Sequence, residues 1–124
     1  MVKILFLVTG GVLGTILRYV CSGWAYQWWG TQFPYGTMMV NLSGCFIMGL
    51  LSSLSQNKFL LNEEMRLLLM IGFCGAFTTF STWIFETDQM LKDGEFIKAL
   101  LNVVLSVILG YIIYRLGYFV AQII

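Results

Sequence analysis

The chain has 124 residues, of which 59% are hydrophobic and only 10% are charged. Soluble domains carry roughly 25% charged residues, so this composition rules out water as the main solvent and predicts an integral membrane protein. The formal net charge of +1 comes without a basic run or an acidic tail. This argues against nucleic-acid binding and leaves membrane lipid, a small solute or a second copy of the chain as partners.

The sequence offers little for catalysis. It has no histidine, which removes the commonest proton shuttle and metal ligand. The three cysteines, Cys21, Cys45 and Cys74, fall in apolar segments without C-x-x-C spacing, which argues against a disulfide framework. Because no nucleophile–base pair is evident either, we do not expect an enzyme.

Four apolar segments predict the fold. A membrane-spanning helix needs about 20 apolar residues, and the predicted spans cover residues 4–26, 36–55, 65–85 and 96–121. Such runs are too long and too continuously apolar for barrel strands. We therefore expect an all-α membrane protein with four transmembrane helices in a single transmembrane domain over residues 1–124.

The segments between the spans hold turn and charged residues. Pro34, the only proline, lies in the first predicted turn, and Asn62 is the predicted N-cap of the third helix. Residues 86–95 are expected to form a charged loop. The first span lacks a small-residue cleavage site, so we expect it to be retained.

Lysine and arginine residues give almost no orientation signal. Four positive charges fall on the side of the two termini and three on the other side: Lys3, Lys58, Arg66 and Arg115 against Arg18, Lys92 and Lys98. A difference of one leaves the positive-inside rule little to act on. Either the chain has one weakly specified orientation, or it inserts in both.

The third span contains an unusual polar stretch, residues 72–83, with two glycines and four hydroxyl residues. Gly75 permits a backbone break, and Thr78 and Thr79 can satisfy the freed backbone groups, so the sequence predicts a helix broken at mid-membrane. The carbonyl groups at such a break suit a small cation, and its N–H groups suit an anion. The alternative is that glycine and threonine serve only close helix packing.

Polar side chains also occur on the second and fourth spans. Thr37 and Asn41 lie one helical turn apart on one face. A buried asparagine needs partners for two donors and an acceptor, which either an interhelical hydrogen bond or a bound ligand provides. On the fourth span a stripe recurs at every fourth position, and it either lines a pathway or joins helices: Asn102, Ser106, Gly110 and Tyr114.

Charged residues inside the spans are few. Arg18 is costly at membrane depth unless it snorkels to the interface or faces an anion-attracting vestibule, and both alternatives stay open. Gly10 and Gly14 form a G-x-x-x-G pair, typical of close helix packing. The acidic residues are all expected at helix ends or in loops, which argues against proton-coupled transport because that needs a buried carboxylate: Glu63, Glu64, Glu86, Asp88, Asp93 and Glu95.

Three motifs resemble those of the Fluc (CrcB) fluoride ion channel family, and the resemblance covers nearly all of the chain. They read Gly10-Gly11-x-x-Gly14-x-x-x-Arg18-Tyr19, Gly36-Thr37-x-x-Val40-Asn41-x-x-Gly44-Cys45-Phe46-x-x-Gly49 and Gly72-Phe73-Cys74-Gly75-x-Phe77-Thr78-Thr79-Phe80-Ser81-Thr82. The resemblance implies an antiparallel, dual-topology homodimer with two pores. It also implies passive fluoride export across the cell inner (plasma) membrane by a multi-pass protein.

The same resemblance implies roles for individual residues. Backbone carbonyls of Gly75 and Thr78 would hold a structural sodium ion at the dimer centre, and Arg18 would face the vestibule. The fluoride pathway would be lined by Asn41, Phe80, Trp83, Ser81, Thr82, Thr37 and Ser106. The family pattern usually has phenylalanine at position 83, whereas Trp83 is larger and adds an N–H donor.

Two other function classes are open on the sequence. A small dual-topology multidrug or metabolite antiporter has similar length and span number, but it would need an acidic residue in the first span, and there is none. A non-transporting assembly subunit would fit if every polar stripe served packing alone. Fluoride efflux from liposomes distinguishes the three classes.

Overall fold

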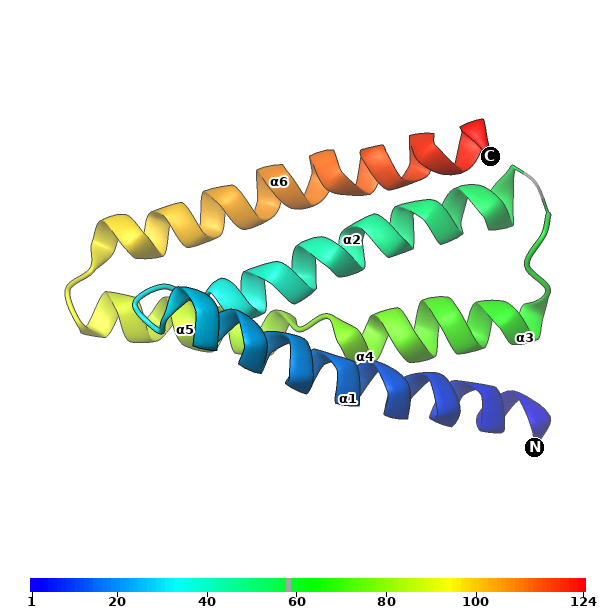
Figure 1. Ribbon diagram of the computed structural model, residues 1–124, viewed down its shortest axis with the longest axis horizontal. Coiled ribbons are helices and arrows are strands. Elements are labelled where there is room, and N and C mark those ends of the chain that lie inside the picture. The colour runs from blue at the N-terminus through cyan, green and yellow to red at the C-terminus, as the bar shows by residue number, and fades with distance from the viewer. Residues whose placement is uncertain (58) are drawn as a thin grey trace.

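The computed structural model describes residues 1–57 and 59–124, and these form an all-helical protein (Figure 1). The elements in chain order are α1 (Val2–Trp29), α2 (Tyr35–Gln56), α3 (Glu63–Arg66), η1 (Leu67–Cys74), α4 (Gly75–Phe77), α5 (Phe80–Lys92) and α6 (Phe96–Ile123). Four helical segments are long and apolar enough to cross a membrane, and the third of them is the run Glu63–Lys92. The predicted all-α membrane protein with four spans is confirmed.

The spans run back and forth along one axis. Figure 1 shows both termini at the same end of the bundle, together with the connection between α2 and α3, and the other two turns at the opposite end. An even number of crossings predicts this arrangement. Lys58, one of the positive charges counted at the terminal end, lies outside the described residues.

Glycine lets two helix pairs pack closely. A Cβ atom added to Gly10 would collide with the carbonyl oxygen of Leu68, and one added to Gly14 would collide with that of Phe73, so α1 and η1 approach backbone to backbone. Gly117 brings α6 equally close to the carbonyl oxygen of Phe46 in α2. The packing role predicted for the Gly10–Gly14 pair is confirmed.

We expect Gly10→Ala to destabilise the folded protein and Gly11→Ala, the matched control, to leave it nearly unchanged. The added methyl group of the first variant meets backbone atoms, whereas nothing lies within 4 Å of a Cβ atom at Gly11. Overpacking costs about 1–3 kcal/mol. Thermal unfolding in detergent measures the difference, and equal midpoints for the two variants would contradict this packing.

Capping residues set the helix ends. The Asn62 side chain accepts a hydrogen bond from the Met65 amide at 2.8 Å, so the predicted N-cap is confirmed. At the end of α5, Gly94 has φ +77°, and the amides of Gly94 and Glu95 bond back to Leu91 and Met90, which is a Schellman motif.

The prediction of a charged loop over residues 86–95 was wrong. α5 remains helical to Lys92, and only residues 93–95 separate it from α6. The prediction took the end of the apolar run as the end of the helix, but polar residues continue a helix readily once it leaves the hydrocarbon. The other helix ends differ from the predicted spans by a few residues.

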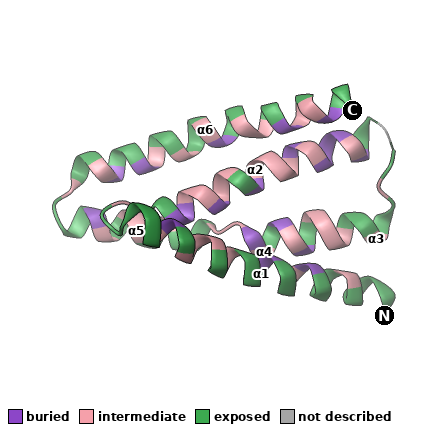
Figure 2. Ribbon diagram, in the orientation of Figure 1, coloured by how far each residue is buried: buried purple, intermediate pink, exposed green. Residues whose placement is uncertain are grey.

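Burial is concentrated between the helices, and the outer surfaces of α1 and α6 are exposed (Figure 2). Large apolar side chains make up most of that outer surface, for example Leu5, Ile16 and Tyr111. The fully buried side chains are smaller, with Val40 and Asn102 the largest of them. This is the distribution expected when lipid, rather than water, contacts the outside of the bundle.

Candidate functional site

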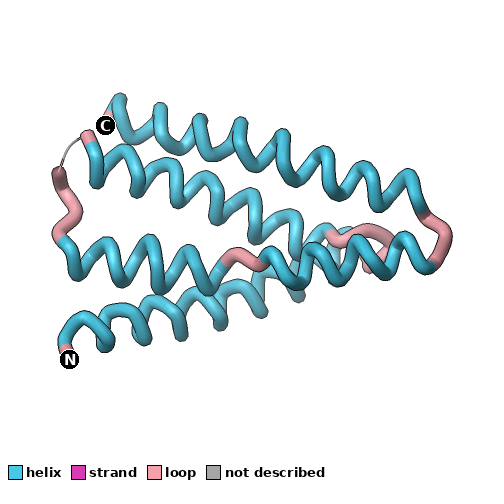
Figure 3. Tube along the Cα trace, turned by 180° about the vertical axis from the view of Figure 1, so that it is seen from behind, coloured by secondary structure: helices cyan, strands magenta, loops and turns pink. Residues whose placement is uncertain are grey.

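Two consecutive residues interrupt the third span. Thr78 has φ −86° and ψ 159°, and Thr79 has φ −148° and ψ 118°, so both are extended between the end of α4 and the start of α5. Gly75, by contrast, is helical at φ −62° and ψ −34°. Figure 3 shows the resulting loop within the span. The change of conformation falls on β-branched residues, which favour extended backbone, and not on the glycine.

Asn41 from α2 stabilises the extended segment. Its Nδ2 donates to the carbonyl oxygen of Thr79 at 3.0 Å, and its Oδ1 accepts from the amide of Thr79 at 2.7 Å. The side-chain amide therefore satisfies both backbone groups of a single residue. The interhelical hydrogen bond considered for Asn41 exists, and Nδ2 carries a second hydrogen beyond the one that this bond uses.

The backbone carbonyls that lose their usual helical donors at this break include those of Gly75 and Thr78. In a continuous helix the amide of Thr79 would bond to the carbonyl of Gly75, and that of Thr82 to the carbonyl of Thr78. Here the Thr79 amide bonds to Asn41, and the Thr82 amide bonds to the Thr79 hydroxyl at 3.3 Å. Carbonyl oxygens freed in this way are the ligands that hard cations prefer, so both residues fit the predicted sodium site chemically.

Arg18 reaches the same segment from α1. Its Nη1 donates to the carbonyl oxygen of Thr78 at 3.3 Å, and the side chain is half-buried. A carbonyl oxygen has two lone pairs, so this bond leaves one further acceptor position on Thr78. Arg18 also lines a surface hollow of about 450 Å³ together with Thr37, Thr79 and Thr82.

Glu86 is a polar residue of the site that the sequence analysis missed. Its Oε1 accepts from the Tyr26 hydroxyl at 2.7 Å and from the Thr37 hydroxyl at 2.8 Å, and its Oε2 is buried without a partner among the described residues. The prediction that every acidic residue lies at a helix end or in a loop was wrong here. Thr79, Thr82 and Glu86 are three and four residues apart, so they share one face of a helix. This spacing in the sequence could have predicted that the Glu86 carboxylate belongs to the polar face of α5.

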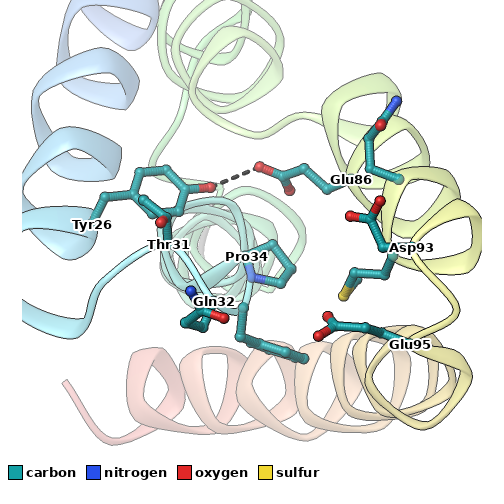
Figure 4. A pocket seen from close by; sticks show the side chains of 10 residues that line it. Tyr26, Thr31, Gln32, Pro34, Glu86, Asp93 and Glu95 are labelled. Carbon is teal, nitrogen blue, oxygen red and sulfur yellow. Dashed lines mark hydrogen bonds between the residues drawn. The ribbon is translucent and has the colours of Figure 1, made fainter.

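A second hollow, of about 330 Å³, lies beside Glu86 at the end of the bundle away from the termini. Figure 4 shows its lining, with Asp93 and Glu95 on one side and the Tyr26–Glu86 hydrogen bond at its edge. Lys98 forms an ion pair with Glu95 at 2.7 Å. Acidic groups therefore predominate among the charged residues of this hollow.

The aromatic residues of the site lie on the first turn of α5. The ring centroids of Phe80 and Trp83 are 5.3 Å apart with planes inclined by 44°. Phe80 is 72% exposed, whereas Trp83 is half-buried and its Nε1 is fully buried without an acceptor among the described residues. Ser81 and Thr82 are exposed beside them.

Several of the predicted site residues lie around one backbone segment, whereas Ser106 is on another helix, α6. Asn41, Thr37, Arg18 and Thr82 surround the extended Thr78–Thr79 segment. Ser106 is half-buried on α6, and its hydroxyl has no hydrogen-bond partner among the residues that the structure describes.

Comparison with known proteins identifies the family. The family described as CrcB-like protein, Camphor Resistance (CrcB), matches residues 5–118. A relative from Hydrogenovibrio crunogenus is 47% identical over 108 residues, which cover 87% of this chain and 82% of the relative. One from Geotalea uraniireducens is 42% identical over 122 residues, or 98% of each chain. Both are named fluoride-specific ion channel FluC. The chain therefore belongs to the CrcB family, whose named relatives are ion channels and not enzymes.

Proposed function

We propose that this chain forms a fluoride-selective channel that exports fluoride passively across the plasma membrane. Family membership is the observation that carries the proposal, because relatives aligned over almost the whole chain are named fluoride-specific ion channels. The site agrees with it chemically. Its side chains are mainly hydroxyl, amide and aromatic groups, which can replace the water of a small anion without binding it too tightly to release.

In this proposal the pathway follows the polar face of α5. Edge-on rings of Phe80 and Trp83 present their positive edges to the anion, and the second N–H of Asn41 donates to it. Hydroxyl groups continue the polar lining before and after the rings: Thr37, Ser81, Thr82 and Ser106. The half-buried Arg18 raises the local anion concentration at the entrance.

We further propose that two antiparallel copies assemble around a sodium ion. The freed carbonyls of Gly75 and Thr78 supply the ligands, and an added Cβ atom at exposed Gly75 would meet nothing within 4 Å, which leaves room for a second subunit. Four carbonyl oxygens brought together from two subunits repel one another unless a cation lies among them.

Fluoride efflux from liposomes tests the proposed function. Purified protein is reconstituted with internal fluoride, and efflux is followed with a fluoride electrode with and without a proton gradient and with chloride as competitor. We expect fast, fluoride-selective efflux that needs no proton gradient. Efflux that requires a gradient would favour the antiporter alternative, for which the half-buried Glu86 is the specific structural observation.

Dual topology predicts labelling from both sides of the membrane. With the native cysteines removed, Lys92→Cys at the end of α5 should react with a membrane-impermeant maleimide added to either side of intact cells or vesicles, because the charge difference between the sides is only one. Lys58→Cys, at the opposite end by sequence, should behave in the same way. Labelling of each site from one side alone would rule out insertion in both orientations.

A further inference from the structure

We infer that Gly44 is a positioning residue for the backbone carbonyl of Thr78, an inference that rests on the sodium site of the proposed function. Gly44 is buried on α2, one helical turn after Asn41. A Cβ atom added to Gly44 would collide with the Cγ2 methyl group of Thr78. The methyl group therefore occupies the space that a side chain at position 44 would need.

This contact is confined to the end of one side chain. Of the three atoms nearest to a Cβ atom at Gly44, the other two lie at ordinary van der Waals distances, Cδ1 of Phe77 at 3.5 Å and Cβ of Thr78 at 3.6 Å. Gly49, further along α2, is different, because its Cβ atom would collide with the backbone carbonyl oxygen of Tyr114. Removal of a single methyl group would thus make room at Gly44 but not at Gly49.

The Thr78 side chain is held in its present rotamer. Its hydroxyl donates to the carbonyl oxygen of Cys74 at 2.9 Å. Threonine adopts staggered rotamers, and of the three groups on its Cβ atom only the hydrogen would fit beside a side chain at position 44. The rotamer that turns this hydrogen toward Gly44 moves the methyl group to the place where the hydroxyl now bonds to Cys74. We therefore expect Thr78 to shift as a whole, its carbonyl oxygen included.

A shift of Thr78 would disturb a closely fitted segment. Arg18 donates to the Thr78 carbonyl at 3.3 Å, and Asn41 bonds to both backbone groups of the next residue, Thr79, at 3.0 and 2.7 Å. A hard cation depends on the distances to its oxygen ligands. In the proposed dimer the shift would occur in both subunits, so the expected consequence is weaker sodium binding.

A compensating pair of substitutions tests the inference. Gly44→Ala should weaken sodium binding, and Thr78→Ser should restore it in the double variant, because serine keeps the hydroxyl that bonds to Cys74 and lacks the methyl group. Each protein is depleted of sodium by long dialysis against N-methylglucamine salts, and fluoride flux is then measured as sodium is added back. We expect Gly44→Ala to need roughly tenfold more sodium for half-maximal flux, and the double variant to need about as much as the unmodified protein.

Gly49→Ala is the matched control for overpacking in α2. It should lower the thermal unfolding midpoint, and Thr78→Ser should not rescue it. A second measurement does not depend on flux: sodium should raise the unfolding midpoint of the unmodified protein, because a ligand stabilises the state that binds it. This rise should be smaller in Gly44→Ala, normal in Gly49→Ala, and restored in the double variant of Gly44→Ala with Thr78→Ser.

The outcomes separate this inference from the proposed function. If Gly44→Ala needs no more sodium than the unmodified protein, or if its defect persists in the double variant, Gly44 does not position Thr78 and the inference alone is wrong. Full flux of the unmodified protein without sodium would overturn the sodium site and this inference with it. Absence of fluoride flux from the unmodified protein would overturn the proposed function, and the sodium-dependent rise in unfolding midpoint would still test the role of Gly44.

Discussion

Replacing Asn41 by leucine should abolish most fluoride flux while the four-helix bundle and the proposed dimer persist. Leucine keeps the same branched heavy-atom skeleton with bulkier ends, but it removes both hydrogen bonds to the backbone of Thr79. Unmet buried groups cost about 1–3 kcal/mol each, so the extended conformation should become roughly 30-fold or more less populated. Efflux from liposomes measures the loss, and size-exclusion chromatography in detergent checks the assembly.

Ser43→Leu is the matched control for this variant. Ser43 is exposed on the same helix, and its hydroxyl bonds only to the Met39 carbonyl one turn earlier, at 2.7 Å. It should therefore keep near-normal flux. If Asn41→Leu conducts fluoride as well as this control does, Asn41 is a packing residue and the extended segment does not depend on it.

Removal of sodium should reduce fluoride flux to background. The carbonyls of Gly75 and Thr78 have lost their helical donors to Asn41 and to the Thr79 hydroxyl. Among the residues that the structure describes, one replacement bond is present, the 3.3 Å contact from Arg18 to Thr78. A hard cation of small radius satisfies such oxygens, whereas a larger one does not fit between them. We therefore expect protein prepared and assayed throughout in N-methylglucamine salts to lose flux, and re-addition of sodium to restore it.

Slow exchange is expected in the sodium experiment, because in the proposed dimer the ion could leave only when the centre opens. Flux should decline over prolonged dialysis rather than at once, and elemental analysis of the same samples gives the residual sodium per dimer. Full flux in protein shown to be free of sodium would refute the central cation. The freed carbonyls would then have to be satisfied by Arg18 and water alone.

The fold could be predicted from the sequence because lipid restricts the alternatives. Apolar segments that are long enough to span a membrane must form helices, because lipid offers their backbone no other hydrogen bonds. Four such helices place both termini on the same side of the membrane. The close packing at Gly10 and the cap at Asn62 could also be predicted from the sequence, since both depend on local residue chemistry. The C-terminal end of α5 could not be predicted from the sequence, because hydropathy shows where a segment leaves the lipid and not where its helix ends.

Details of the site depended on contacts between distant segments. The sequence singled out residues 75–79, but Asn41 and Arg18, which bond there, are far away in the chain, and no local pattern gives their partners. Glu86 was missed for the same reason: its partners, Tyr26 and Thr37, come from two other helices. Local chemistry indicated which backbone would change conformation, and tertiary structure determined what stabilises it.

The hydrogen bonds between Asn41 and Thr79 also bear on the order of assembly during synthesis. A nascent chain emerges from its N-terminus, so α2 leaves the ribosome before residues 78 and 79 do. The side-chain amide that the extended segment needs is then already in place when that segment enters the membrane. A third span synthesised without α2 would lack this partner and should close into an uninterrupted helix, because lipid offers its backbone no other hydrogen bonds.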